Sequence, residues 1–194
     1  KQGILRVFGI FPMGGVGERF SIFSPRPLMQ EGDSMAKKEE KTNVMRVLDK
    51  AGISYRHYTY DASDGHIDGL AVAQKLGQDP DQVFKTLVTQ GASGGYFVFV
   101  IPVREELDLK AAARAVGEKS VSMLHVADLL KVTGYVRGGC SPIGMKKQYP
   151  TVIDETCQLF DTMIFSGGRI GSQVEMAPDD LLSLISASTA DITA

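Results

Sequence analysis

The chain has no tryptophan, only two cysteines and only three histidines among its 194 residues, and these shortages exclude several kinds of protein. Cys140 and Cys157 form no CxxC motif, so neither a disulfide framework nor a structural zinc site is expected. No apolar run approaches the ~20 residues that a membrane-spanning helix needs. The net charge of −2 at pH 7 argues against a protein that binds nucleic acid by bulk electrostatics. We therefore expect a cytoplasmic protein without structural zinc or membrane association.

The residues that are present suit a globular protein with one hydrophobic core. Hydrophobic residues make up 43% of the chain and charged residues 23%, which is typical of a compact domain. Residues 1–34 differ because they have neither a helical nor an alternating period, and Met35 after them resembles a natural start. We expect residues 1–34 to be a leader, an added segment or a misassigned start outside the fold, and residues 35–194 to form a single domain.

The apolar pattern after Lys37 predicts short strands separated by helices. Capping residues and glycine stops mark the boundaries, as with Asp68 before one helix and Gly77 after it. The predicted helices are a segment ending at Ala51 and residues 69–76, 109–116, 124–132 and 178–185, and the predicted strands are residues 53–60, 83–90, 96–102, 135–137, 151–154, 163–166 and 173–176. This order favours an α/β (α+β) fold built on a mixed, mainly antiparallel β-barrel flanked by helices, rather than a doubly wound parallel sheet.

Lys85 is the strongest single candidate for a functional side chain. In the strand VFKTLVTQ it shares one face with Val83 and Leu87, and the opposite face is largely apolar as well. A lysine in such a strand extends to solvent or pairs with a carboxylate, or else it lines a cleft where its ammonium stabilises developing negative charge. The residues alone favour the first interpretation without excluding the second.

Two glycine-rich loops, GYVRGGCSPIGMKK at residues 134–147 and SGGRIG at residues 166–171, are the second candidate feature. Glycine lets backbone N–H groups approach a ligand closely, and such donors stabilise a tetrahedral oxyanion. A single Gly-Gly pair is more often a tight turn, but two such loops beside an inward lysine favour a cleft. The candidate residues are Gly138, Gly139, Ser141, Ser166, Gly167 and Gly168.

Cys140, inside the first loop, has to be considered as a nucleophile. A catalytic cysteine needs an activating base or an electropositive setting, and no motif ties a histidine to this one. We therefore favour a small buried or loop thiol.

Three segments, VFKTLV, GGCSPIG and SGGRIG, resemble the YbaK/EbsC family of aminoacyl-tRNA deacylases, which are free-standing trans-editing proteins. The resemblance covers about residues 42–186. It implies a mixed β-barrel flanked by helices that releases the amino acid from mischarged tRNA, most typically Cys-tRNA(Pro). It also implies that no metal or other cofactor takes part, that the acceptor end of aminoacyl-tRNA is bound, and that prolyl-tRNA synthetase is a partner.

The resemblance also assigns roles to individual residues. It implies that Lys85 is catalytic and that Thr86 beside it completes a Lys-Thr signature. Tyr60 matches a tyrosine of the family motif and would line the same cleft. Gln173 stands where cysteine-specific members have aspartate, a departure that concerns the choice of amino acid rather than the reaction. In those members the substrate's own thiol is thought to attack its ester and cyclise.

Three functions from different classes remain open. The first is the deacylase, the second a non-catalytic module that binds tRNA or the synthetase, and the third a redox or regulatory protein centred on Cys140. The inward lysine together with the two loops favours the first. For RNA binding by this acidic chain we expect a basic rim around the cleft, made of Lys37, Lys38, Lys41, Arg137, Lys146, Lys147 and Arg169.

Overall fold

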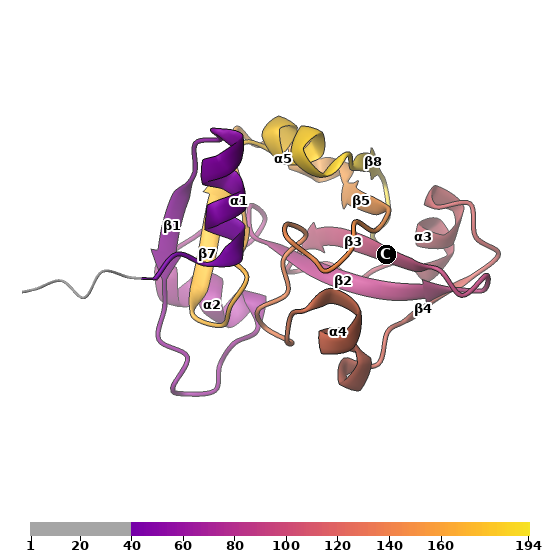
Figure 1. Ribbon diagram of the computed structural model, residues 1–194, viewed down its shortest axis with the longest axis horizontal. Coiled ribbons are helices and arrows are strands. Elements are labelled where there is room, and N and C mark those ends of the chain that lie inside the picture. Colours follow the sequence, from indigo (N-terminus) through magenta and orange to yellow (C-terminus); the bar gives the residue numbers. More distant parts are fainter. Residues whose placement is uncertain (1–39) are drawn as a thin grey trace, which may run out of the picture. The chain divides into compact units, whose positions relative to one another are not determined.

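The computed structural model describes residues 40–194, which form two β-sheets and five α-helices (Figure 1). The expectations for residues 1–34, Lys37 and Lys38 lie outside the described residues. In chain order the elements are α1 (Asn43–Ala51), β1 (Arg56–Thr59), α2 (Gly69–Leu76), β2 (Phe84–Gly91), β3 (Tyr96–Pro102), α3 (Leu109–Ala115), β4 (Val121–Met123), α4 (Val126–Thr133), β5 (Thr151–Asp154), the 3₁₀-helix η1 (Glu155–Leu159), β6 (Met163–Ser166), β7 (Ser172–Met176), α5 (Pro178–Ile185) and β8 (Ser188–Ala190).

Helix α1 covers one face of the smaller sheet. Thr42 begins the helix because its hydroxyl accepts a hydrogen bond from the Met45 N–H, and Gly52 ends it in the left-handed conformation. The buried face of α1 carries Val44, Met45 and Leu48. These side chains belong to the main core together with side chains of the antiparallel sheet, whose strand order is β1-β7-β6.

The larger sheet has the strand order β4-β2-β3-β5-β8. Strands β2 and β3 form the long antiparallel hairpin predicted from the sequence, whereas β5 and β8 are added in parallel. The second core cluster, which includes Phe99, Ile101 and Ala112, joins α3 to this sheet. Phe84 and Val88 pack into the main core while Leu87 packs against the second cluster, which confirms that β2 is covered on both faces.

The two sheets meet at a single parallel bridge between Val83 and Ile164. Helix α2 covers this junction, where Ala73 packs with Val83, Val103 and Ile164. The mixed, mainly antiparallel class with flanking helices is confirmed. Within residues 40–194 the strands form two separate sheets, so closure into a barrel is not confirmed.

The strand predicted at residues 135–137 is wrong. This segment is a turn after α4, because Gly134 ends the helix with φ 86° and the chain then enters the first glycine loop. The apolar Tyr135 is explained by packing, since its side chain is buried and its hydroxyl donates to the Ile143 carbonyl at 2.6 Å. Strands β4 and β8 were not predicted because three residues are too few to show an alternating period.

Residues 188–194 tie together distant parts of the larger sheet. Strand β8 pairs with β5, and the Ile192 N–H donates to the buried Asp154 carboxylate at 3.3 Å. The Ile192 carbonyl accepts from the Asp108 N–H at 2.9 Å, directly before α3. The segment around residues 106–108 is therefore held in place by the end of the sheet. None of the helices in residues 40–194 is long and apolar enough to cross a bilayer.

Candidate active site

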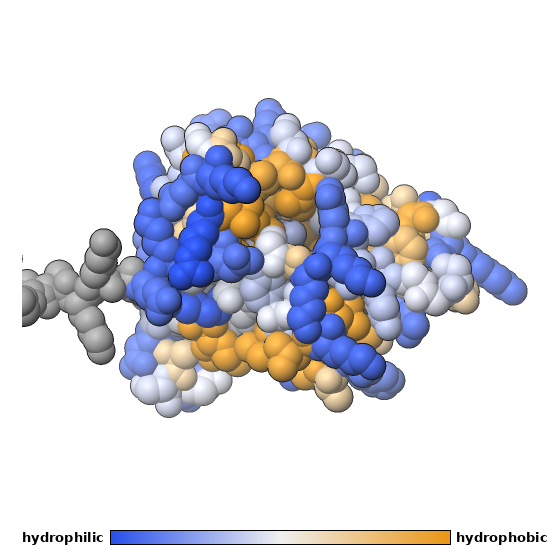
Figure 2. Space-filling view, viewed as in Figure 1, coloured by the Kyte–Doolittle hydropathy of each residue, from blue (hydrophilic) through white to orange (hydrophobic). Residues whose placement is uncertain are grey.

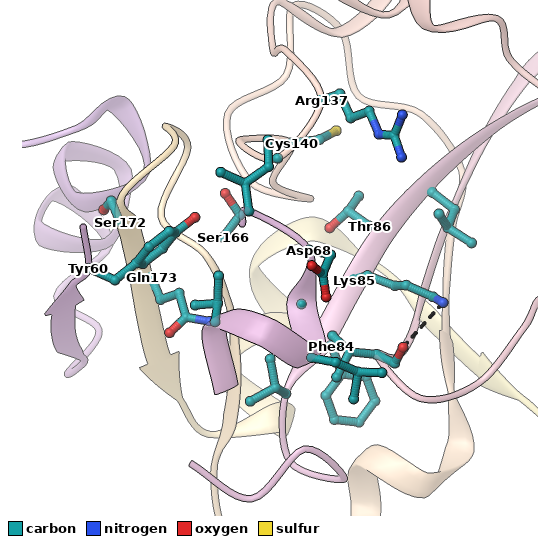
Figure 3. A pocket seen from close by; sticks show the side chains of 18 of the residues that line it. Tyr60, Asp68, Phe84, Lys85, Thr86, Arg137, Cys140, Ser166, Ser172 and Gln173 are labelled. Atoms are coloured by element: carbon teal, nitrogen blue, oxygen red, sulfur yellow. Dashed lines mark hydrogen bonds between the residues drawn. The ribbon is translucent and has the colours of Figure 1, made fainter. Parts of the chain in front are cut away.

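A cavity of about 810 Å³ opens where β2, the start of α2, strands β6 and β7 and the first glycine loop converge (Figure 3). Besides Cys140 and Arg137, six of the ten catalytic and substrate-binding candidates from the sequence line it together. They are Tyr60, Lys85, Thr86, Gly138, Ser166 and Gln173. The first and last of them, Tyr60 and Gln173, lie more than 100 positions apart in the sequence, so the fold brings them into one site.

Lys85 lines this cavity and also has an acidic neighbour. Its ammonium donates to the Val103 carbonyl at 3.3 Å and to the Glu106 carboxylate at 3.4 Å. The Glu106 side chain is 85% exposed, whereas that of Lys85 is 28% exposed. Because water competes for so exposed a carboxylate, the pair holds Lys85 only weakly. The ammonium therefore has a carboxylate partner, as the first interpretation expects, and the residue also lines a cavity; stabilisation of developing charge by Lys85 stays a prediction.

Two polar side chains of the cavity have buried oxygen atoms without a partner. These are the hydroxyl of Thr86 and the carbonyl oxygen of the Gln173 amide, which make no hydrogen bond within the described residues. Gln173 is only 5% exposed. A buried polar atom without a partner is rare in folded proteins and costs free energy. Both residues line the cavity, so these unpaired atoms are buried in its walls.

The four remaining loop candidates, Gly139, Ser141, Gly167 and Gly168, are not among the residues that line the cavity. The N–H groups of Gly139, Gly167 and Gly168 already donate within the chain, to the Val136 carbonyl, the Ser172 carbonyl and the Ser166 hydroxyl. The N–H of Gly138 has no acceptor within residues 40–194. The loops thus leave Gly138 as the glycine donor available at the cavity.

The two glycine loops touch each other through their backbones. A Cβ atom placed on Gly139 would lie 3.0 Å from the Ile170 nitrogen and 3.1 Å from the Arg169 backbone. Real Cβ atoms rarely come this close to backbone atoms that cannot move aside. Gly139 is therefore needed for close packing of the two loops. This packing holds the loop that contains Gly138 against the loop that follows Ser166.

Cys140 lines the cavity but is poorly placed to act as a nucleophile. Its thiol is 8% exposed, and burial raises its pKa to about 12. The thiolate is the reactive form, so almost none is present at neutral pH. The partly buried His57 has its Nε2 atom 3.1 Å from the Ser172 hydroxyl. These observations support the view of Cys140 as a buried thiol.

Two carboxylates, one lining the cavity and one buried next to a lining residue on the same strand, were not predicted as part of the site. Asp68, expected only as a helix cap, does cap α2 through a bond from the Ala71 N–H, and it also lines the cavity. Two residues beyond Gln173, the buried Glu175 carboxylate accepts hydrogen bonds from the Tyr58 and Thr162 hydroxyls. Desolvation raises the pKa of Glu175, but these bonds and Arg56 outweigh it, so the net pKa is lowered. The carboxylate is therefore ionised at neutral pH.

Comparison with known proteins identifies the family. Residues 69–184 match the model of the aminoacyl-tRNA editing domain. The chain belongs to this family. Over 161 residues it is 48% identical to the "Putative Cys-tRNA(Pro)/Cys-tRNA(Cys) deacylase EbsC" of Enterococcus faecalis (strain ATCC 700802 / V583), a match that covers 82% of this chain and 98% of the relative.

Solved structures support the fold of the editing domain. One described as "a putative trans-editing enzyme for prolyl tRNA synthetase" superimposes with a TM-score of 0.69 at 24% identity, covering 80% of this chain and 99% of the other. The hypothetical protein APE2540 superimposes with a TM-score of 0.72 at 23% identity, covering 80% of this chain and 100% of the other. At these identities the likeness concerns the fold alone.

The described residues of the expected basic rim have different surroundings in this editing domain. Arg137 lines the large cavity, whereas Lys147 lines a second one of about 170 Å³. That second cavity has apolar walls between α1 and α5, where apolar surface is visible in Figure 2. Lys146 donates to the carbonyls of residues 130 and 131 at the end of α4, and Lys41 pairs with Asp49 at 2.6 Å. Within residues 40–194 no three His, Cys, Asp or Glu side chains gather as a metal site requires.

Proposed function

We propose that this editing domain is a trans-editing deacylase that removes a wrongly attached amino acid, most readily cysteine, from tRNA(Pro) in the cytoplasm. The observation that carries the proposal is that Lys85 lines one cavity together with Thr86 and Gln173, whose side-chain oxygens are buried and unpaired within residues 40–194. The 48% identity to a relative named for Cys-tRNA(Pro) and Cys-tRNA(Cys) supports the choice of substrate.

The proposed chemistry needs charge stabilisation more than a nucleophilic side chain. Attack on the aminoacyl ester carbon gives a tetrahedral oxyanion, which the Lys85 ammonium and the Gly138 N–H would stabilise. When this intermediate collapses, the bond to the ribose oxygen breaks and that oxygen takes up a proton. Water is the attacking group in hydrolysis. For a cysteinyl ester, the substrate's own thiol can attack instead and close a ring, which requires no protein nucleophile.

The other cavity residues would bind and orient the aminoacyl group. Tyr60, Thr86, Ser166 and Gln173 offer hydroxyl or amide groups around the proposed reaction centre. Ser141, Gly139, Gly167 and Gly168 would contribute by shaping the two loops rather than by touching the substrate. Arg137 is the cation best placed to meet the acceptor end, since it lines the cavity and is exposed.

We further propose prolyl-tRNA synthetase as the partner that supplies most of the selectivity for the whole tRNA. The chain carries a net charge of −2, so few phosphates can be neutralised, and the affinity for tRNA should fall only shallowly with salt. The description of one structural neighbour as a trans-editing enzyme for this synthetase supports the same partner.

The decisive experiment is deacylation of a panel of mischarged tRNAs by the purified full chain, with and without prolyl-tRNA synthetase. We expect release of cysteine from Cys-tRNA(Pro) and little release of proline from Pro-tRNA(Pro). Tight tRNA binding without release of any amino acid would favour the alternative function, a non-catalytic binding module, in which the Lys85–Glu106 pair would be structural.

A further inference from the structure

The carboxamide of Gln173 has a buried oxygen atom without a partner and belongs to a residue that lines the cavity. The residue lies on β7 and is 5% exposed, and its Oε1 atom has no hydrogen-bond partner within residues 40–194. Figure 3 shows its side chain on the wall opposite the Lys85 ammonium. A buried carbonyl oxygen accepts hydrogen bonds and cannot donate one. Whatever occupies this part of the cavity should therefore bring an N–H or O–H group.

The charges around Gln173 favour a cationic donor over a neutral one. Gln173 and Glu175 lie on the same face of β7, and hydrogen bonds hold the Glu175 carboxylate in its ionised form. Arg56 balances this charge only in part, because its guanidinium is 3.7 Å away and its side chain is 77% exposed. Asp68 lines the cavity and adds a second carboxylate on the α2 side, while the other lining carboxylate, Glu106, is paired with Lys85. The cations of the cavity, Lys85 and Arg137, lie away from Gln173 in Figure 3.

An aminoacyl ester has one cationic donor that does not depend on its side chain, the α-ammonium group. Lys85 repels this group and attracts the ester carbonyl, so the two ends of the cavity orient the aminoacyl group in one direction. We infer that the Gln173 carbonyl oxygen accepts a hydrogen bond from the α-ammonium. The site would then select aminoacyl esters with a free amino group and reject N-acylated ones, such as formylated aminoacyl or peptidyl esters.

This inference rests on the proposed function and extends it, because it names the part of the substrate that Gln173 binds. Acylation of the α-nitrogen removes its positive charge and leaves a single N–H. It also adds bulk at a wall where Gln173 is already buried. Both changes disfavour binding, whichever amino acid is attached.

The test uses stable analogues in which an amide replaces the ester, so that binding is measured without cleavage. The probes are 3′-cysteinylamino-3′-deoxyadenosine and its N-acetyl derivative, titrated by calorimetry under reducing conditions. We expect the full chain to bind the free-amine probe about tenfold or more tightly than the N-acetyl probe, as for a hydrogen bond to a charged group. Gln173→Met, which keeps the length but removes the acceptor, should reduce this ratio to about threefold or less.

Matched variants separate recognition from general effects on the fold. Gln78 also has a buried amide without a partner but does not line the cavity, so Gln78→Met should keep the ratio of the wild type. Gln173→Glu keeps an acceptor oxygen and should keep or increase the ratio. Equal binding of both probes by the wild type, or an unchanged ratio in a folded Gln173→Met, would overturn the inference.

The result is distinguishable from a failure of the proposed function. A protein that shows the expected ratio of probe affinities but cleaves no mischarged tRNA would bind the aminoacyl end without catalysis. The proposed deacylase activity would then be rejected, and the role of Gln173 would stand. A protein that cleaves Cys-tRNA(Pro) but binds both probes equally would retain the deacylase and lose the role of Gln173.

Discussion

Replacing Lys85 by methionine should abolish most deacylation while leaving the fold intact. The change removes the ammonium but keeps a long apolar side chain in β2. In stability, Lys85→Met removes a 3.4 Å pair with a carboxylate that is 85% exposed, and such pairs contribute about 0–1 kcal/mol. In catalysis, the loss of one preorganised donor to an oxyanion lowers the rate by about 10²–10³. The two effects differ enough to be measured separately.

The assay is single-turnover release of cysteine from Cys-tRNA(Pro), with thermal melting followed by circular dichroism on the same samples. Glu106→Gln is the matched control, because it removes the acidic partner of Lys85 and leaves the ammonium in the cavity. This control should remain within about threefold of the wild-type rate, as expected of an exposed surface pair. A folded Lys85→Met that retains a rate within a few-fold of the wild type would refute the role of the ammonium in catalysis.

Three further predictions concern the walls of the site. Cys140→Ser should leave the rate of deacylation nearly unchanged. Because burial raises the pKa of Cys140 to about 12, the native thiol should react with iodoacetamide far more slowly than the unfolded chain up to pH 9.5. Fast alkylation with loss of activity would contradict this. Because the folded pKa of Glu175 is lowered, its contribution to stability is complete above its unfolded pKa and is lost as the pH falls through the folded value. Glu175→Gln should therefore lower the free energy of unfolding by about 1.5–3 kcal/mol at pH 7 and by progressively less toward pH 3, as denaturant titrations at several pH values would show; a difference independent of pH would count against a charged Glu175. Gly139→Ala should cost about 1–3 kcal/mol, because its Cβ meets backbone of the other loop, whereas Gly95→Ala, with no contact closer than 3.5 Å, should change the stability by under about 0.5 kcal/mol; equal effects would show that the loops separate easily.

The elements with clear capping residues were predictable from the sequence. The bounds of α2 follow from Asp68 and Gly77, and the structure places both caps as expected. The hairpin of β2 and β3 also follows, since each strand has a long apolar run. The parallel addition of β5 and β8 could not be predicted, because these pairings join residues far apart in the chain and nothing local encodes them.

The site was predictable in its residue types but not in its hydrogen bonding. The Lys-Thr pair and Gly138 do line the cavity. A Gly-Gly motif alone cannot say which N–H is already used, and here Gly139 proves to be a packing position. Asp68 and Glu175 were not predicted as part of the site. The sequence explains Asp68 as a helix cap, and Glu175 as one position in an alternating strand. The position of Asp68 at the cavity and the burial of Glu175 both depend on the whole fold.

The late position of β8 in the chain has a consequence for synthesis on the ribosome. Strand β5 lies between β3 and β8, and the buried Asp154 at its end receives its Ile192 partner from residues made about forty positions later. Until that segment leaves the exit tunnel, β5 presents an open edge whose backbone groups can pair with another chain. Contacts over such sequence separations also slow folding. Nascent chains paused before residue 188 should therefore be more prone to aggregate than finished ones.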